Sequence, residues 1–333
     1  HGVFGYTDVT EDWRRAVCGW FTRRHGFAPD PEWLIFSTGV VPILSSTVRK
    51  LTTPNENVLL LTPVYNVFYN SIVNNGCRPL EVPLLYRAGE YQIDFPALER
   101  GLADPQTSLM ILCNPHNPIG KIWDRETLAR IGSLAAKHHV TVISDEIHCD
   151  LTDPGRDYVP YASVSEECRN SCAVCFAPTK TFNLAGIQTA GVMVPDPFLR
   201  HKLWRALNTD EVAEPNVFAV PAAVAAYNGG DEWLDALRAY LYRNKQTARD
   251  FIRAELPRLT VVPGEATYLL WLDCRDYTDD SVALAREIRA RTGLFLSNGS
   301  QYGRGGETFL RMNIACPRAR VLDGLERLRR ALS

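Results

Sequence analysis

The sequence contains no apolar run approaching the roughly 20 residues that a membrane-spanning helix requires, and we expect no secretory signal. It also has no internal repeat, no low-complexity tract and no obvious linker. Charge of one sign is not in excess, since the formal net charge is −2. We therefore expect neither nucleic acid nor an anionic membrane as a partner. With 333 residues, of which 46% are hydrophobic, the chain is long enough for a large core.

The cysteines support neither a disulfide framework nor a zinc site. Nine is an odd number, in a chain too large to need disulfides for stability. Cys168, Cys172 and Cys175 are close in sequence, but the run 172–176 is typical of a buried strand, which would place Cys172 and Cys175 on opposite faces. Structural zinc needs four convergent ligands, so we expect no metal. The cysteine pattern fits a reducing cytoplasm, where we expect the protein to reside.

Between residues 35 and 195, short apolar runs rich in β-branched residues alternate with helical patterns. An amphipathic helix is expected before them, over 11–24, and another helix is expected to start near Asp124. Near-continuous apolar strands separated by helices favour a mostly parallel sheet covered by helices on both faces. The expected strands are 58–61, 108–113, 140–144, 172–177 and 189–194.

After Pro221 the pattern changes to that of a smaller α+β unit. Helices are expected over 231–256, 281–291 and 318–332, and strands over 268–273 and 309–314. We therefore predict an α/β protein with an N-terminal arm and helix over 1–30, a large domain over 31–215 and a small C-terminal domain over 216–333. In such proteins ligands bind at the carboxyl ends of the parallel strands.

Polar residues follow three of the predicted strands. The strand at 140–144 is followed by Asp145, Glu146 and His148, which are either solvated loop residues or include a buried carboxylate that pairs with a cationic ring nitrogen. Lys180 follows the strand at 172–177, in a place where an amine removed from water would act as a nucleophile and base. Asn117 lies in a loop with two Asn-Pro pairs, which is either a simple turn or the source of an amide for a ligand oxygen.

Taken in order, these segments resemble the class I/II aminotransferase superfamily of fold-type I enzymes that use pyridoxal 5′-phosphate (PLP). The three motifs are Asn-Pro-His-Asn-Pro-x-Gly at 114–120, Ser-Asp-Glu-Ile-His at 144–148 and Lys-Thr-Phe-Asn-x-Ala-Gly at 180–186. Within the superfamily, the chain is most similar to the cystathionine β-lyase branch of the MalY/PatB type. Further matching segments lie at 4–7, 37–41, 62–65 and 310–313, so the resemblance covers almost the whole chain.

The resemblance implies a role for each matching residue around the PLP ring. Lys180 holds the cofactor as a Schiff base and later carries the α-proton of the substrate. Asp145 pairs with the pyridine nitrogen, and Tyr65 stacks on the ring face. Asn117 and His148 lie near the phenolic oxygen of the ring.

The resemblance also implies how the phosphate and the substrate are held. The phosphate binds at a helix N-terminus formed by Gly39, Val40 and Val41, where free backbone N–H groups attract an anion. The hydroxyl of Thr179 adds to this site, and Tyr6 reaches the phosphate of a neighbouring subunit in a homodimer. Arg311 grips the α-carboxylate of an amino-acid substrate.

Two residues depart from the general aminotransferase pattern at the phosphate. Gln188 stands where many relatives have Arg, although the lyase branch often has Gln there, and Ala177 stands where Ser is common. How the phosphate is held with these two residues is left open. The resemblance further implies a segment upstream of Phe4 that closes over the active site.

Residue spacing alone does not choose the reaction. Loss of a β-thiolate would give pyruvate and ammonia, whereas reprotonation on the cofactor would give transamination. The resemblance, which extends to Gly-Ser-Gln-Tyr-Gly at 299–303, favours a PLP-dependent C–S β-lyase for cystathionine or related S-substituted cysteines. An aminotransferase remains the alternative. A ligand-sensing regulatory module is the third hypothesis, although the sequence has no basic helix-turn-helix segment. The natural sulfur substrate stays undetermined.

Overall fold

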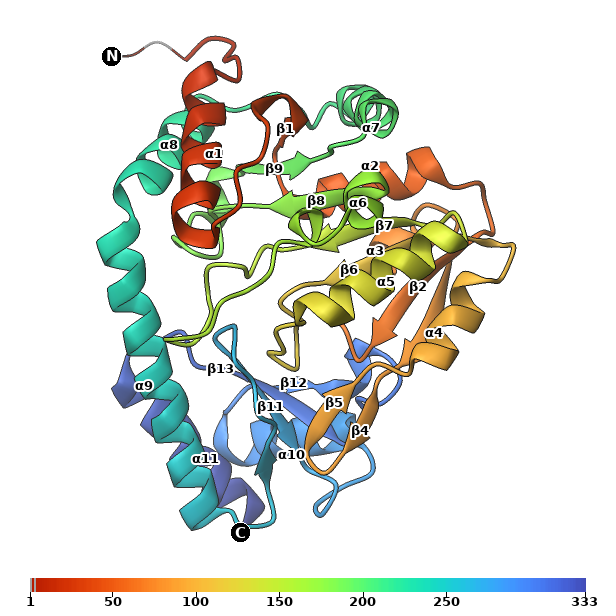
Figure 1. Ribbon diagram of the computed structural model, residues 1–333. Coiled ribbons are helices and arrows are strands. Elements are labelled where there is room, and N and C mark those ends of the chain that lie inside the picture. The colour runs from red at the N-terminus through yellow and green to blue at the C-terminus, as the bar shows by residue number, and fades with distance from the viewer. Residues whose placement is uncertain (1, 3) are drawn as a thin grey trace.

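A computed structural model describes residues 2 and 4–333. Figure 1 shows a large central sheet with helices on both faces, and a smaller sheet beside it that packs against its own helices. The two parts are linked by α9 (Asp231–Glu255), a long helix that runs along one side of the molecule. Within the described part of the chain, no helix is both long enough and apolar enough to cross a membrane.

The large sheet has seven strands in the order β1-β9-β8-β7-β6-β2-β3. The five strands from β8 to β3 pair in parallel, while β9 is antiparallel to both of its neighbours. A mostly parallel sheet is therefore confirmed, and each of the five strands predicted between 58 and 194 is present. The strand bounds are β1 (Leu34–Ser37), β2 (Asn57–Thr62), β3 (Arg78–Pro83), β6 (Thr107–Cys113), β7 (Thr141–Asp145), β8 (Cys172–Phe176) and β9 (Ala190–Met193).

Helices cover both faces because the central strands are apolar on both sides. Along β8, Cys172 belongs to one buried cluster and Cys175 to the other, so their sulfurs lie on opposite faces as predicted. The first cluster contains side chains of α1 (Glu11–His25), α4 (Phe95–Leu102) and α5 (Arg125–Lys137). The second contains side chains of α2 (Val40–Leu51), α3 (Val67–Val73) and α7 (Pro197–Thr209).

The smaller sheet has the order β10-β11-β13-β12 and is antiparallel throughout. One of its faces packs against α10 and α11, and the other carries Trp271 and Phe309, whose stacked rings lie 5.0 Å apart and join the core of the large sheet. The bounds are β10 (Thr260–Val261), β11 (Leu269–Asp273), β12 (Ser297–Asn298), β13 (Phe309–Asn313), α10 (Ser281–Thr292) and α11 (Arg318–Leu332).

The remaining elements are short, and α8 was not predicted. Helix α8 (Ala219–Gly229) packs against α1, and α6 (Glu166–Asn170) packs against α5. A hairpin of β4 (Leu85–Arg87) and β5 (Glu90–Gln92) forms a separate two-stranded sheet. Helix α9 joins the two cores, because its Leu234 and Leu241 belong to the first cluster while Ala248 and Ile252 pack with α10 and α11.

Candidate active site

A cavity of about 340 Å³ lies where the central parallel strands end. The register of the sheet places Cys113, Asp145 and Cys175 level with one another on β6, β7 and β8, so the segments that follow these strands meet at one edge. Ten of the predicted site residues line this cavity: Gly39, Val40, Val41, Tyr65, Asn117, Asp145, His148, Thr179, Lys180 and Arg311.

Lys180 lies in a tight turn directly after β8. Two backbone hydrogen bonds close this turn: the N–H of Phe182 donates to the Pro178 carbonyl at 2.8 Å, and the N–H of Leu184 donates to the Thr179 carbonyl at 3.0 Å. The Lys180 side chain is half-buried and lines the cavity. The turn thus presents a primary amine from a fixed backbone.

The two acids after β7 lie in different surroundings. Asp145 is buried at the cavity and accepts a hydrogen bond from the Ile147 N–H at 3.2 Å; burial raises the pKa of its carboxyl to about 6. Glu146 is fully buried away from the cavity and accepts hydrogen bonds from Ser144, Tyr158 and the Tyr161 N–H. Alternation along the strand thus assigns one acid to the site and the other to the core.

His148 is an uncharged imidazole at the cavity wall. Burial, together with the nearby positive charges of Lys180 and Arg311, lowers its pKa to about 3. Its Nδ1 is buried and has no hydrogen-bond partner among residues 2 and 4–333. Its ring packs edge-on against Tyr268, with centroids 5.7 Å apart.

Arg311 reaches the cavity from the smaller sheet. Along β13, Phe309 faces the large sheet while Leu310 and Met312 pack toward α10 and α11, so alternation turns Arg311 toward the large sheet as well. Its Nη1 donates to the Asn117 Oδ1 at 3.1 Å, and its guanidinium lies 4.9 Å from the centre of the Tyr302 ring. These contacts hold the guanidinium at the cavity.

The N-terminus of α2 forms another part of the cavity wall. Gly39 caps the helix without a side-chain hydrogen bond, and Val40 and Val41 form its first turn. The first backbone N–H groups of a helix lack intrahelical partners and favour an anion. Tyr65 lies nearby, and its ring is held edge-on by Phe68 at 5.6 Å.

Tyr6 lies apart from the cavity of this chain. Its side chain is fully exposed. Gln188 and Ala177 do not line the cavity either: Gln188 is exposed and Ala177 is buried in the core. His116 in the Asn-Pro loop is buried, and its Nε2 lies 2.9 Å from the Pro63 carbonyl oxygen.

Sequence reasoning missed several residues of the cavity wall. Ile147 could have been predicted from the sequence, because it lies between Asp145 and His148 in the same motif. The sequence signal for Tyr268 and Asn313 was weaker: each is a polar residue near one end of a predicted strand. The remaining residues of the wall are Thr38, Pro42, Cys113, Ala185 and Leu269.

Comparison with known proteins gives a consistent result. Residues 2–328 match the family described as aminotransferase class I and II. The chain belongs to this family. It is 43% identical over its full length to cystathionine beta-lyase PatB of Bacillus subtilis, of which the alignment covers 86%. It is 33% identical to protein MalY of Escherichia coli, again over its full length and over 85% of MalY.

The fold comparison agrees with the sequence match. The crystal structure of cystalysin from Treponema denticola, which contains a PLP cofactor, superposes with a TM-score of 0.96 at 32% identity. The match covers 99% of this chain and 84% of cystalysin. The fold-type I architecture predicted for this family member is therefore confirmed, and so is its resemblance to the C–S lyase branch.

The cavity of this family member fits PLP. A buried carboxylate suits a cationic ring nitrogen, and no charged side chain among residues 2 and 4–333 donates a hydrogen bond to the buried Asp145 carboxyl. The orphaned Nδ1 of His148 suits a polar atom of a ligand. The N-terminus of α2 suits a phosphate, and Lys180 supplies the primary amine that PLP requires.

Proposed function

We propose that this protein is a PLP-dependent C–S β-lyase that cleaves cystathionine or a related S-substituted cysteine to a thiol, pyruvate and ammonia. One observation carries the proposal. Lys180, Asp145 and Arg311 converge on a single cavity in a chain that is 43% identical to a cystathionine β-lyase. Fold kinship alone would not be enough, because one fold serves many reactions.

The cavity residues would hold PLP by complementary contacts. Lys180 would hold the cofactor aldehyde through Nζ, and Asp145 would pair with the pyridine nitrogen. Tyr65 would hold the ring face, Asn117 and the neutral His148 would hold the phenolic oxygen, and Gly39, Val40, Val41 and Thr179 would hold the phosphate. When bound, PLP supplies an electron-withdrawing ring that stabilises negative charge at the substrate Cα.

The chain's own groups position the substrate and move its proton. Arg311 pairs with the α-carboxylate, and its hydrogen bond to Asn117 fixes the direction of the guanidinium. Lys180 Nζ, released as a free amine when the substrate amine takes its place, accepts the proton from Cα. When the Cβ–S bond breaks, its electron pair leaves with sulfur as a thiolate, and water completes the conversion of the remaining fragment to pyruvate and ammonia.

We also propose that the protein is a cytoplasmic homodimer in which Tyr6 reaches the phosphate site of the neighbouring subunit. The full exposure of Tyr6 supports this arrangement, as does the exposure of Phe4 and Phe218, whose ring centroids lie 6.3 Å apart. The nine free cysteines are compatible with a reducing compartment. The proposed domains are the N-terminal arm and helix over 1–30, the large domain over 31–215 and the small domain over 216–333.

The deciding experiment combines visible absorbance with an assay for pyruvate. The purified protein loaded with PLP is expected to absorb in the visible range and to release pyruvate from L-cystathionine. The absorbance of the covalently bound cofactor is expected to be lost in Lys180→Ala, and activity to fall by about 10²–10⁴-fold from loss of the base alone. Formation of a 2-oxo acid only in the presence of an acceptor 2-oxo acid would identify an aminotransferase instead. If the protein does not bind PLP, the enzyme proposal fails, and the ligand-sensing regulatory module is the hypothesis that remains.

A further inference from the structure

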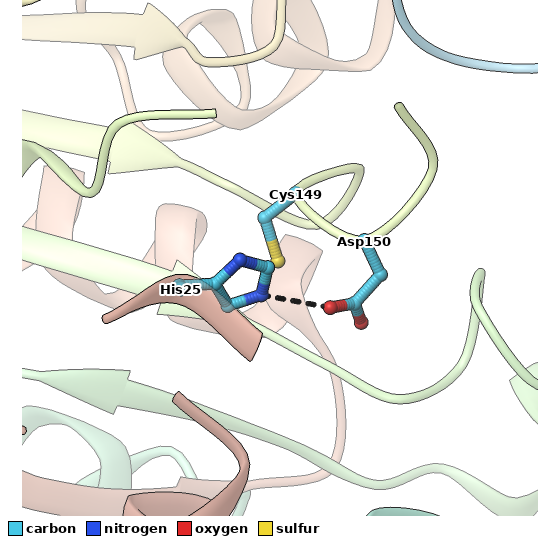
Figure 2. A group of neighbouring side chains, drawn as sticks. All are labelled: His25, Cys149 and Asp150. Carbon is cyan, nitrogen blue, oxygen red and sulfur yellow. Dashed lines mark hydrogen bonds and ion pairs between the residues drawn. The ribbon is translucent and has the colours of Figure 1, made fainter. Parts of the chain in front are cut away.

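Three side chains, two of them from α1, converge on the buried carboxylate of Asp150. Its Oδ1 accepts hydrogen bonds from Trp20 Nε1 at 2.9 Å and from His25 Nε2 at 2.8 Å. Its Oδ2 accepts one from the Thr181 hydroxyl at 2.8 Å. Figure 2 shows His25 directed at Asp150, with the Cys149 sulfur beside the ring.

The cluster contains groups that bind metals, but its arrangement favours a hydrogen-bonded anion. Two N–H donors already occupy the Oδ1 that would face an ion between His25 and Cys149. The adjoining space is only about 20 Å³, and Arg24 and Arg238 line it, so their charges oppose a cation. Burial also raises the pKa of the Cys149 thiol, which opposes the thiolate that a metal requires.

The carboxylate connects three separate parts of the chain. Trp20 and His25 lie on α1, Asp150 lies in the segment after β7, and Thr181 directly follows Lys180. Asp150 and Thr181 are both buried, so water does not compete for their hydrogen bond. Burial by itself raises the pKa of Asp150, but hydrogen bonds from His25, Thr181 and Trp20 outweigh it and lower the pKa below its ordinary value. The anion therefore persists at neutral pH.

We propose that Asp150 is a positioning residue for Lys180: by accepting the Thr181 hydrogen bond, it fixes the turn over 178–184 and with it the direction of the lysine Nζ. This inference rests on the proposed role of Lys180 as the base at the substrate Cα. The turn has its own backbone hydrogen bonds at Phe182 and Leu184, but these hold it together internally. The bond from Thr181 to Asp150 ties it to α1 and to the segment after β7. Proton transfer is sensitive to displacements of about 1 Å, so a released turn would slow the chemical step.

The test compares Thr181→Val, which removes the hydroxyl at nearly constant volume, with Thr181→Ser, which keeps it. In the PLP-loaded protein with L-cystathionine, Thr181→Val is expected to lower kcat by about 10- to 100-fold. KM is expected to change little, because the substrate contacts of Arg311 remain. Thr181→Ser should restore most of kcat. If Thr181→Val does not fold, Thr181→Ala takes its place in the same comparison.

A second measurement uses the cofactor-free protein and needs no substrate. Hydrogen exchange of the peptide spanning 178–184 should be faster in Thr181→Val than in the parent and close to the parent in Thr181→Ser. The matched control is Thr292→Val, which removes a threonine hydroxyl that donates to the Ile288 carbonyl at 2.8 Å in α10, in the smaller part of the molecule. Thr292→Val should change neither kcat nor the rate of hydrogen exchange in the peptide spanning 178–184.

The two measurements separate the possible failures. If the parent forms no pyruvate, the proposed function fails, and exchange at 178–184 still decides whether Asp150 anchors the turn. Unchanged exchange and unchanged kcat in Thr181→Val would overturn the positioning role. An equal loss of kcat in Thr292→Val would overturn it too, because the effect would then reflect general destabilisation.

Discussion

Arg311 and Asn117 are joined by a hydrogen bond of 3.1 Å between Nη1 and Oδ1. Asn117 follows a strand of the large sheet, whereas Arg311 lies on β13 of the smaller one, 194 positions further along the chain. The proposed carboxylate site therefore spans both sheets. Its geometry depends on how the two parts pack, which involves Trp271 and Phe309 of the smaller sheet, because both side chains belong to the core of the large sheet.

Replacing Arg311 tests this site directly. Arg311→Lys keeps the positive charge but removes the planar pair of donors and the bond to Asn117. We expect KM for L-cystathionine to rise by about 10- to 100-fold, the equivalent of one charge-assisted hydrogen bond. Arg320→Lys, at an exposed arginine of α11, is the matched control and should leave KM unchanged. An unchanged KM in Arg311→Lys would assign the carboxylate to another group.

The buried charge of Asp145 should make the cofactor-free protein less stable above pH 6. Burial raises the pKa of Asp145 to about 6 from 3.8, so the folded chain holds this proton more tightly than the unfolded chain does. The destabilisation is absent below pH 3.8, grows as the pH rises toward 6, and is complete above it.

Asp145→Asn removes that charge and should therefore stabilise the cofactor-free protein at pH 8, by up to roughly 3 kcal/mol. The gain should be small at pH 4, where the parent carboxyl is largely protonated. Urea unfolding at the two pH values measures the difference. A variant that is less stable than the parent at pH 8 would contradict the assignment of Asp145 as an unpaired buried acid. With PLP present, the same variant should have lower activity because the ring nitrogen loses its partner.

Tyr6 is expected to act across the proposed dimer interface. Tyr6→Phe keeps the ring but removes the hydroxyl that would reach the phosphate of the neighbouring subunit. We expect the dissociation constant for PLP to rise by about 10-fold, while the dimer stays intact by sedimentation. Tyr242→Phe, at a partly exposed tyrosine of α9, is the control. Unchanged cofactor affinity in Tyr6→Phe would remove this residue from the site.

Two glycines in helices should respond in opposite ways to alanine. A Cβ at Gly132 in α5 would overlap the Cys168 sulfur, so Gly132→Ala should destabilise the protein by about 1–3 kcal/mol despite better helix propensity. A Cβ at Gly19 in α1 would meet the Arg23 side chain at 3.5 Å, an ordinary van der Waals contact, so Gly19→Ala should stabilise the protein by up to about 1 kcal/mol. Thermal unfolding of the two variants, compared with the parent, measures both changes in stability. Equal effects would show that the packing of α5 on α6 is looser than described.

Local pattern was enough for five of the helices and for five strands of the large sheet, namely α1, α5, α9, α10, α11, β2, β6, β7, β8 and β9. The strands of the parallel sheet are buried on both sides, so their apolar runs stand out in the sequence. Helix α1 was predicted because Trp13, Val17, Trp20 and Phe21 recur at helical spacing and so share one face. All four side chains are buried in the structure. Helix α8 and the direction of β9 were not predicted. Both depend on distant partners, α1 for the helix and β1 and β8 for the strand.

The sequence by itself determined which residue types were available at the strand ends, because Asn117, Asp145 and Lys180 each follow an apolar run. Their ordered motifs also identified the family. Only the tertiary structure decided that Tyr268 lines the cavity and that Asp150 links α1 to the turn carrying Lys180. The physical reason is that these contacts join segments separated along the chain, by 130 positions for Trp20 and Asp150 and by 31 for Asp150 and Thr181, and local spacing does not encode them.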